Sequence, residues 1–193
     1  MSEQATVGRE PKRIWWVRPR KLCALERPGG GGRSHRPERR AAEIEHLRAC
    51  GVRLVISTMV TRHNLAAYEA AGLRWHHRPV ASAGAGEAAL DELLPVLRRE
   101  LRGRGAVAVH GNRQTDFVAA LCAAHLHEST GLDPVEGLTR AAAAGLVVTG
   151  GAARLIGVEW GEGDQLSAEA DAGTAQPRSR IAASTAAGRS VTT

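Results

Sequence analysis

The stretch Ala106-Val-Ala-Val-His-Gly-Asn-Arg-Gln-Thr-Asp-Phe-Val-Ala-Ala-Leu121 decides the fold of this chain. Residues 106–110 form a short apolar run that predicts a buried strand, and small and polar residues of a turn follow it. Residues 117–126 are apolar nearly all round, which predicts a helix buried on every side. A strand that leads through a short loop into a buried helix is typical of an α/β core.

Helix and strand patterns alternate before and after this stretch. Pro37 suits the first turn of a helix that ends at Gly51 and places four residues on one face: Ala41, Ile44, Leu47 and Cys50. The other expected elements are strand 52–56, helix 62–71, strand 73–80 and helix 90–101. Pro95 should lie near the start of the last helix or kink it. This order predicts an α/β fold with a central, mostly parallel sheet of about four to five strands and helices on both faces.

Composition predicts one folded domain with a tail at each end. A chain of 193 residues that is 43% apolar can bury one core and little more. We expect a flexible N-terminal tail at residues 1–12, a domain at 13–160 and a disordered tail at 161–193, where bulky apolar residues become rare. The sequence has neither a transmembrane segment nor the apolar run of a signal peptide, so we expect a cytoplasmic protein without membrane contact.

The net charge of +6 raises the question of nucleic-acid binding. Residues 9–40 concentrate this charge, yet they contain no interleaved aromatic stacking platform and no recognition-module signature. The strong preference for arginine, together with abundant Ala and Gly, is also what a GC-rich genome gives without selection for phosphate contacts. The pattern therefore favours a solvated basic edge or a patch for an anionic partner over nucleic-acid binding.

Cysteine and histidine spacing argues against a metal site. The chain has three widely spaced cysteines, which we expect to be reduced thiols: Cys23, Cys50 and Cys122. His76 and His77 should point to opposite faces of a strand, and His125 and His127 do not share a helix face. We therefore expect neither a metal nor a cofactor.

Several segments carry a family resemblance by their order. The opening Ile14-Trp-Trp-Val-Arg-Pro-Arg-Lys-Leu-Cys-Ala-Leu-Glu-Arg-Pro28 is followed by His46-Leu-Arg-Ala-Cys-Gly-Val-Arg-Leu-Val-Ile-Ser57 and, after the strand at 106–110, by Gly131-Leu-Asp-Pro-Val-Glu-Gly-Leu138. The first is similar to the Trp-Val-x-Pro-x-x-Leu-Ala start of small atypical dual-specificity phosphatases, and the second resembles their helix, glycine and buried strand. The resemblance covers roughly residues 14–156 and implies the fold of the protein tyrosine phosphatase superfamily.

The catalytic signature of that family is His-Cys, five residues, then Arg and Ser or Thr. His110 matches its histidine, but Gly111 stands at the position of the nucleophilic cysteine and Phe117 at that of the arginine. The family's general-acid aspartate lies three residues beyond the proline of Trp75-His-His-Arg-Pro-Val80, and counting from Pro79 places Ser82 there. The resemblance therefore implies a phosphatase scaffold with a degenerate active-site loop.

Each of these three replacements removes a chemical role. Glycine has no side chain to attack phosphorus, a phenyl ring cannot hold phosphoryl oxygens by a bidentate fork, and a serine hydroxyl is too weak an acid to protonate the leaving oxygen. Free N–H groups of the loop would still favour an anion, with Arg113 as a displaced ligand, although Asp116 can cap the same groups. The possible ligand loop consists of His110, Gly111, Asn112, Arg113, Gln114, Thr115 and Asp116.

The leading hypothesis is a pseudophosphatase, catalytically inactive, that binds an unknown protein or a phosphorylated ligand. The alternative is an active phosphatase or other hydrolase of phosphorylated substrates with a relocated site near Asn112, Arg113, Gln114 and Asp116. Burial in the apolar helix should keep the Cys122 thiol inert, so it does not replace the lost nucleophile. A third hypothesis is a decaying gene without a selected role, against which a cooperative unfolding transition would count.

Overall fold

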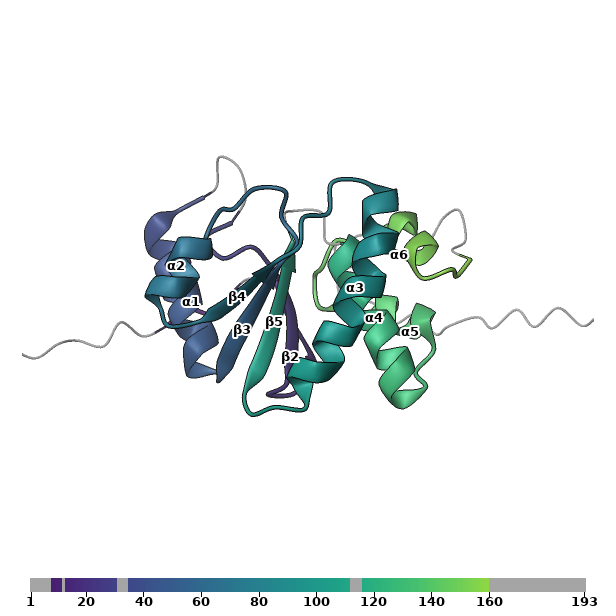
Figure 1. The fold of residues 1–193 in the computed structure, drawn as a ribbon, viewed down its shortest axis with the longest axis horizontal. Coiled ribbons are helices and arrows are strands. Elements are labelled where there is room, and N and C mark those ends of the chain that lie inside the picture. Colours follow the sequence, from purple (N-terminus) through teal and green to yellow (C-terminus); the bar gives the residue numbers. More distant parts are fainter. Residues whose placement is uncertain (1–7, 12, 31–34, 112–115, 160–193) are drawn as a thin grey trace, which may run out of the picture.

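A single five-stranded sheet organises the computed structural model, which describes residues 8–11, 13–30, 35–111 and 116–159. The strands lie in the order β1-β2-β5-β3-β4, and Figure 1 labels β2, β5, β3 and β4. Strand β1 is antiparallel to β2, and every other neighbouring pair is parallel. Their bounds are β1 Ile14–Arg18, β2 Leu22–Glu26, β3 Val52–Ser57, β4 Arg74–His77 and β5 Ala106–Gly111. The prediction of an α/β fold with a mostly parallel central sheet is confirmed.

Helices cover both faces of this sheet (Figure 1). One face carries the helices α1 Pro37–Ala49 and α2 Leu65–Ala70. The other carries α3 Ala83–Leu101, α4 Asp116–Thr130, α5 Pro134–Ala143 and α6 Gly150–Leu155. Successive side chains of β5 alternate between the two cores, with Val107 and Val109 on the α4 side and Ala106 and Ala108 on the α1 side. Strand β5 therefore belongs to both cores.

Helix α4 is the central helix, as its apolar sequence predicts. All side chains from Phe117 to Ala123 are buried, and the helix contacts α3, α5 and α6 as well as strands β2 and β5. Between Phe117 and Ala123 the helix therefore has no face left for water. Its first turn is therefore placed firmly beside the end of β5.

Several element boundaries differ from the predictions. Helix α3 begins at Ala83 instead of residue 90, so Pro95 lies well inside it, which corrects the expected position near the helix start. Pro95 is exposed, as is Asp91, whose carbonyl the proline leaves without its helical N–H partner. Water can satisfy that carbonyl, so the helix tolerates the proline. Helix α2 and strand β4 are shorter than predicted, and Ala41 of α1 is exposed whereas Glu43 is buried.

The predicted tails fall largely outside the described residues. Residues 161–193 do so entirely, and of the N-terminal tail only residues 8–11 are described. There the backbone N–H of Arg9 donates a hydrogen bond to the carbonyl of Ala42 in α1 at 3.0 Å. Within the described ranges, none of the helices combines the length and the apolar character needed to cross a membrane.

Candidate functional site

The carboxyl ends of four strands meet at one edge of the sheet. Glu26 of β2 pairs with Gly111 of β5, while Ser57 of β3 pairs with both His110 and His77. The loop that leads from β5 to α4 starts from this edge. Open α/β sheets bind ligands there, because the loops that leave the strand ends surround a common space. This edge is therefore the candidate site.

His110 is a buried core residue at this edge. Its Nε2 lies 2.9 Å from the hydroxyl of Tyr68 in α2, and its Nδ1 lies 3.4 Å from the carbonyl oxygen of Gly111. Complete burial lowers the pKa of His110 to about 4, because a charged imidazolium would lose its hydration. Burial likewise raises the pKa of Tyr68. The pair is therefore uncharged at neutral pH and fixes α2 against β5.

Backbone contacts of Thr58 join the neighbouring strand ends. The carbonyl of His110 accepts hydrogen bonds from the N–H of Thr58 at 2.9 Å and from its hydroxyl at 3.1 Å. The carbonyl of Thr58 in turn accepts from the N–H of Val80 at 3.1 Å. These bonds continue the sheet beyond its last residues and hold the edge rigid.

Phe117 and Ser82 have structural roles in this arrangement. Phe117 is the second residue of α4 and is only 7% exposed. Its ring packs beside Gly86 of α3, where a Cβ would lie 3.6 Å from the ring and 2.8 Å from Leu155 of α6. The Ser82 hydroxyl caps α3 by accepting a hydrogen bond from the N–H of Ala85 at 3.3 Å. Neither side chain is an ionised group that faces the end of β5.

Two cavities adjoin Phe117. The smaller, of about 300 Å³, lies beside Gly111 and is walled by residues 58–61 and 80–81. None of its described lining residues is ionisable. The larger, of about 400 Å³, lies between the starts of α3, α4 and α6, and its charged lining groups are Glu87, Asp116 and Arg154. The described walls of the recess beside Gly111 therefore offer polar and apolar contacts but no charged side chain.

Asp116 contacts the start of α6. Its carboxylate accepts hydrogen bonds from the N–H and the hydroxyl of Thr149, both at 2.6 Å. Gly151 lies so close that a Cβ there would be 2.8 Å from Oδ2 of Asp116. The described hydrogen bonds of Asp116 thus differ from the predicted cap of its own helix, because the folded chain brings a distant pair of donors to the carboxylate.

The structure places only part of the predicted ligand loop. His110 and Gly111 end β5, and Asp116 begins α4. The other four predicted loop residues lie outside the described residues: Asn112, Arg113, Gln114 and Thr115. The ends of the loop are therefore fixed by the sheet and by the central helix.

All three cysteines of the chain lie within the described residues, and none lies at this edge. Cys23 in β2 and Cys122 in α4 are fully buried, and burial raises the pKa of Cys122 to about 12. Cys50 follows α1 at the start of β3, so the six residues of that strand separate it from the site by about 20 Å. No thiol is available beside Gly111.

The described histidines lie on several different elements. Nε2 of His77 lies 2.8 Å from the carbonyl oxygen of Met59, whereas His76 lies near Glu92. His125 is buried in α4, and the exposed His127 contacts the carbonyl of Leu132. In the part of the chain that the structure describes, no three His, Cys, Asp or Glu side chains are grouped to hold a metal ion.

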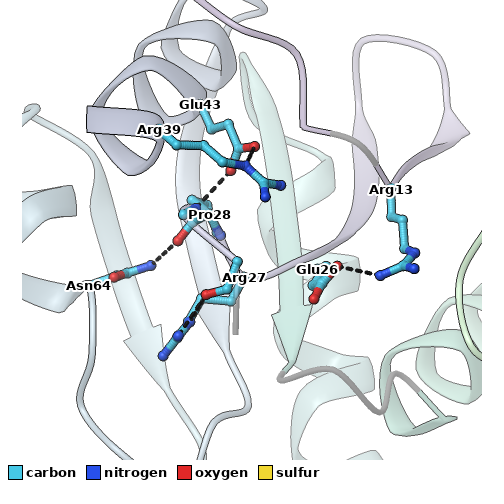
Figure 2. Close-up of polar contacts among 9 residues, drawn as sticks. Arg13, Glu26, Arg27, Pro28, Arg39, Glu43 and Asn64 are labelled. Atoms are coloured by element: carbon cyan, nitrogen blue, oxygen red, sulfur yellow. Dashed lines mark hydrogen bonds and ion pairs between the residues drawn. The ribbon is translucent and has the colours of Figure 1, made fainter. Parts of the chain in front are cut away.

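Residues after β2 form a polar cluster that the sequence did not indicate as a site. Arg27 is 7% exposed, and its Nε and Nη2 donate to the carbonyl of Gly30 at 2.9 and 2.6 Å (Figure 2). Asn64 donates from Nδ2 to the carbonyl of Pro28 at 2.8 Å. Two features of the sequence mark this region. One is the glycine run that follows Arg27, and the other is the charged residue Glu43 within an apolar helix face. Neither reveals that Arg27 follows the residue paired with Gly111.

Comparison with known proteins gives a match to solved structures. No protein-family model matches the sequence, and no curated protein matches it either. Human DUSP28 is 20% identical, covering 78% of this chain and 93% of that chain with a TM-score of 0.58. TpbA of P. aeruginosa is 17% identical and has a TM-score of 0.61, and the match covers 76% of this chain and 85% of that chain. Tk-PTP in its active form is 18% identical and has a TM-score of 0.57, and the match covers 75% of this chain and 94% of that chain. The chain thus has the fold of dual-specificity and tyrosine phosphatases.

Proposed function

We propose that this chain is a pseudophosphatase, which binds a protein partner or a phosphorylated ligand and does not hydrolyse it. The observation that carries the proposal is the end of β5, where Gly111 stands and none of the three cysteines approaches. Hydrolysis by the cysteine-dependent mechanism needs a thiolate at that point, because the thiolate is the group that attacks phosphorus. The buried thiols of Cys23 and Cys122 do not take over this role.

The position predicted for the catalytic arginine supports the same proposal. Phe117 packs into the core between α3 and α6, so this position supplies apolar contact and not positive charge. The cavity beside Gly111 has no cation among its described lining residues. Without a guanidinium fork, charge that develops on the phosphoryl oxygens in a transition state is left uncompensated.

Binding without hydrolysis is compatible with this fold. A cysteine-to-serine variant of P. aeruginosa TpbA is in complex with phosphotyrosine, and that structure is similar to this chain with a TM-score of 0.59 at 18% identity. In that protein a phosphorylated residue binds although the cysteine is replaced. We extend this separation of binding from catalysis to the present chain.

An active hydrolase with a relocated site is the second candidate. It is favoured by the cavity of about 400 Å³, which brings the carboxylates of Glu87 and Asp116 near Arg154. A carboxylate and a guanidinium in one cavity are the groups that acid–base catalysis on a phosphorylated substrate requires. The sequence-based form of this candidate also names Asn112, Arg113 and Gln114, which lie outside the described residues. Against it, both oxygens of Asp116 already accept hydrogen bonds from Thr149.

Turnover of para-nitrophenyl phosphate by the purified protein tests the proposal. We expect the native protein and Arg113→Ala to release no more phenolate than a protein-free blank. Arg140→Ala is the matched control, since Arg140 lies on the exposed side of α5 and pairs with Glu136. Turnover that persists in Arg140→Ala and vanishes in Arg113→Ala would overturn the pseudophosphatase proposal and support the relocated site.

A second arm asks whether the scaffold retains space for the chemistry. Gly111→Cys restores a thiol at the end of β5 without touching the packed ring of Phe117, whereas Gly111→Cys/Phe117→Arg also restores the guanidinium but removes core packing. A gain of turnover in either variant supports a phosphatase scaffold that lost its nucleophile. Cooperative thermal unfolding of the native protein, measured by calorimetry, would argue against a decaying gene.

A further inference from the structure

Arg27 is a buried cation without a paired carboxylate among the described residues. It lies on the β2 side of β5, whereas the cavity beside Gly111 lies on the β3 side. Two of its donors are used on one neutral carbonyl, that of Gly30 (Figure 2). Arginine stays protonated in proteins even when it is buried. Burial of a charge without an opposite charge is costly, so this position favours an anion.

Glu26 and Glu43, the two carboxylates drawn with Arg27 in Figure 2, have other partners. Glu26 is bound to Arg13 at 2.8 Å. Glu43 accepts hydrogen bonds from the side chain of Arg39 at 2.6 Å and from the N–H of Gly29 at 2.7 Å. Both carboxylates therefore already have cationic partners, and neither forms a described ion pair with Arg27.

Further cationic and imidazole groups lie around the same loop. Gly29 has a φ of +89°, and a Cβ there would lie 2.8 Å from Cβ of Arg40 and 3.1 Å from Nε2 of His35. The backbone and these two side chains therefore lie in close contact. The pKa of His35 is lowered by burial and, to a smaller extent, by the positive charges of Arg27, Arg40 and His63. The described residues pair no carboxylate with Arg40.

We propose that Arg27, His35 and Arg40 form a binding site for a small oxyanion of the phosphate class. A phosphate offers several acceptor oxygens and up to two negative charges, which match the guanidinium and imidazole groups that lie around Gly29 and interact electrostatically with one another. A single carboxylate would neutralise less of the assembled charge. The three proposed ligand residues lie outside the loop between β5 and α4 in sequence, so their role can be tested independently of turnover.

Inorganic phosphate, compared with sodium chloride at equal ionic strength, is the probe. Two quantities are measured by NMR: the imidazole pKa of His35, and the change in the His35 chemical shift as phosphate is added until it saturates. The variant His35→Asn assigns the resonance. We expect phosphate to raise that pKa saturably, because a bound anion favours the imidazolium form, and chloride to leave it nearly unchanged. Phenyl phosphate in a parallel titration distinguishes an esterified ligand from the free ion.

Two arginines of α1 give a matched pair of variants. Arg40→Gln should weaken phosphate binding about tenfold, the usual loss for a hydrogen bond to a charged group. Arg48→Gln makes the same charge change about 12 Å further along the helix, at an exposed residue paired with Glu45, and should leave binding unaltered. Arg27→Gln should abolish binding, with circular dichroism as the check that the loop held by Arg27 does not unfold the protein.

Three results would overturn the site. The first is an equal effect of phosphate and chloride on the pKa of His35. The second is an equal loss of phosphate affinity in Arg40→Gln and Arg48→Gln. The third is loss of phosphate binding in Arg113→Ala while Arg40→Gln binds normally. Failure of the pseudophosphatase proposal looks different, because it is measured as turnover. A native protein that hydrolyses aryl phosphate and keeps saturable phosphate binding at Arg40 would refute the inactivity while supporting this site.

Discussion

The hydroxyl of Tyr68 lies 2.9 Å from Nε2 of His110, and this contact joins α2 to the end of β5. The two rings meet edge to face, with centroids 5.7 Å apart. Both side chains are fully buried. His110, which the resemblance assigns to the signature histidine, is therefore held by a core contact with Tyr68.

Removal of the tyrosine hydroxyl tests this contact. Tyr68→Phe should lower the free energy of unfolding by about 1–3 kcal/mol, because Nε2 of His110 is then buried without a partner. In His110→Leu/Tyr68→Phe both polar partners are gone, so the double variant should lose less than the sum of the two single variants. Urea unfolding, monitored by tryptophan fluorescence, gives the free energy of unfolding of the native protein, of Tyr68→Phe, of His110→Leu and of the double variant. Additive losses would show that the two residues are not coupled.

The pH dependence of stability follows from His110. Its pKa is about 4 in the folded protein and about 6.5 when unfolded, so between these values the unfolded chain binds a proton that the folded chain excludes. This contribution is complete above pH 6.5, falls by on the order of 3 kcal/mol as the pH drops towards 4, and changes no further below that. His110→Leu should flatten the unfolding free energy between pH 4 and 6.5. Substitution of the exposed His127 by Gln should not.

Close packing between α4 and α5 predicts opposite effects of two glycine substitutions. A Cβ at Gly137 would lie 2.9 Å from Cβ and 3.1 Å from Cα of Ala123, whereas Gly84 in α3 has nothing within 4 Å. Gly137→Ala should therefore destabilise the protein by about 1–3 kcal/mol. Gly84→Ala should stabilise it by up to about 1 kcal/mol through helix propensity. Thermal unfolding compares them, and equal shifts in melting temperature would contradict the packing argument.

Asp116 should stabilise the start of α6 locally. Asp116→Ala leaves the N–H of Thr149 without its acceptor and should cost about 1 kcal/mol, with faster amide exchange at residues 149–152. Asp133→Ala is the control, since Asp133 caps α5 by accepting from the N–H groups of Val135 and Glu136. The variant Asp133→Ala should speed amide exchange at the start of α5 instead. Unchanged exchange at Thr149 in Asp116→Ala would argue against the contact.

The fold was predictable where the pattern of a segment reflects its burial directly. Residues 106–109 and 117–123 are apolar because β5 and α4 are enclosed, so a single sequence sufficed to recognise both elements. The start of α3 at Ala83 was not recognised, because its first turns are small residues without a hydrophobic period. The buried Glu43 was missed for a related reason, since its partners Arg39 and Gly29 are identified only once the loop is folded.

The resemblance assigns Gly111, Phe117 and Ser82 to the family's catalytic positions by counting along the chain, and this assignment stays a prediction. Arg27 was not predictable, because its place beside β5 depends on the pairing of β2 with β5, more than eighty residues apart in sequence. Periodicity reports which side of a strand is buried but not which strand lies next to it. Sites that arise from such long-range pairing have no signature in a single sequence.

The position of β5 between β2 and β3 has a consequence for synthesis on the ribosome. The pairs β1–β2 and β3–β4 are made first, but they are joined only by the strand that is translated last. Until residues 106–111 emerge, each pair has an open edge on the side that β5 will occupy, and such edges pair readily with other chains. Closure of the sheet over these long separations is a slow step. The nascent chain is therefore most prone to aggregation just before its central strand is complete.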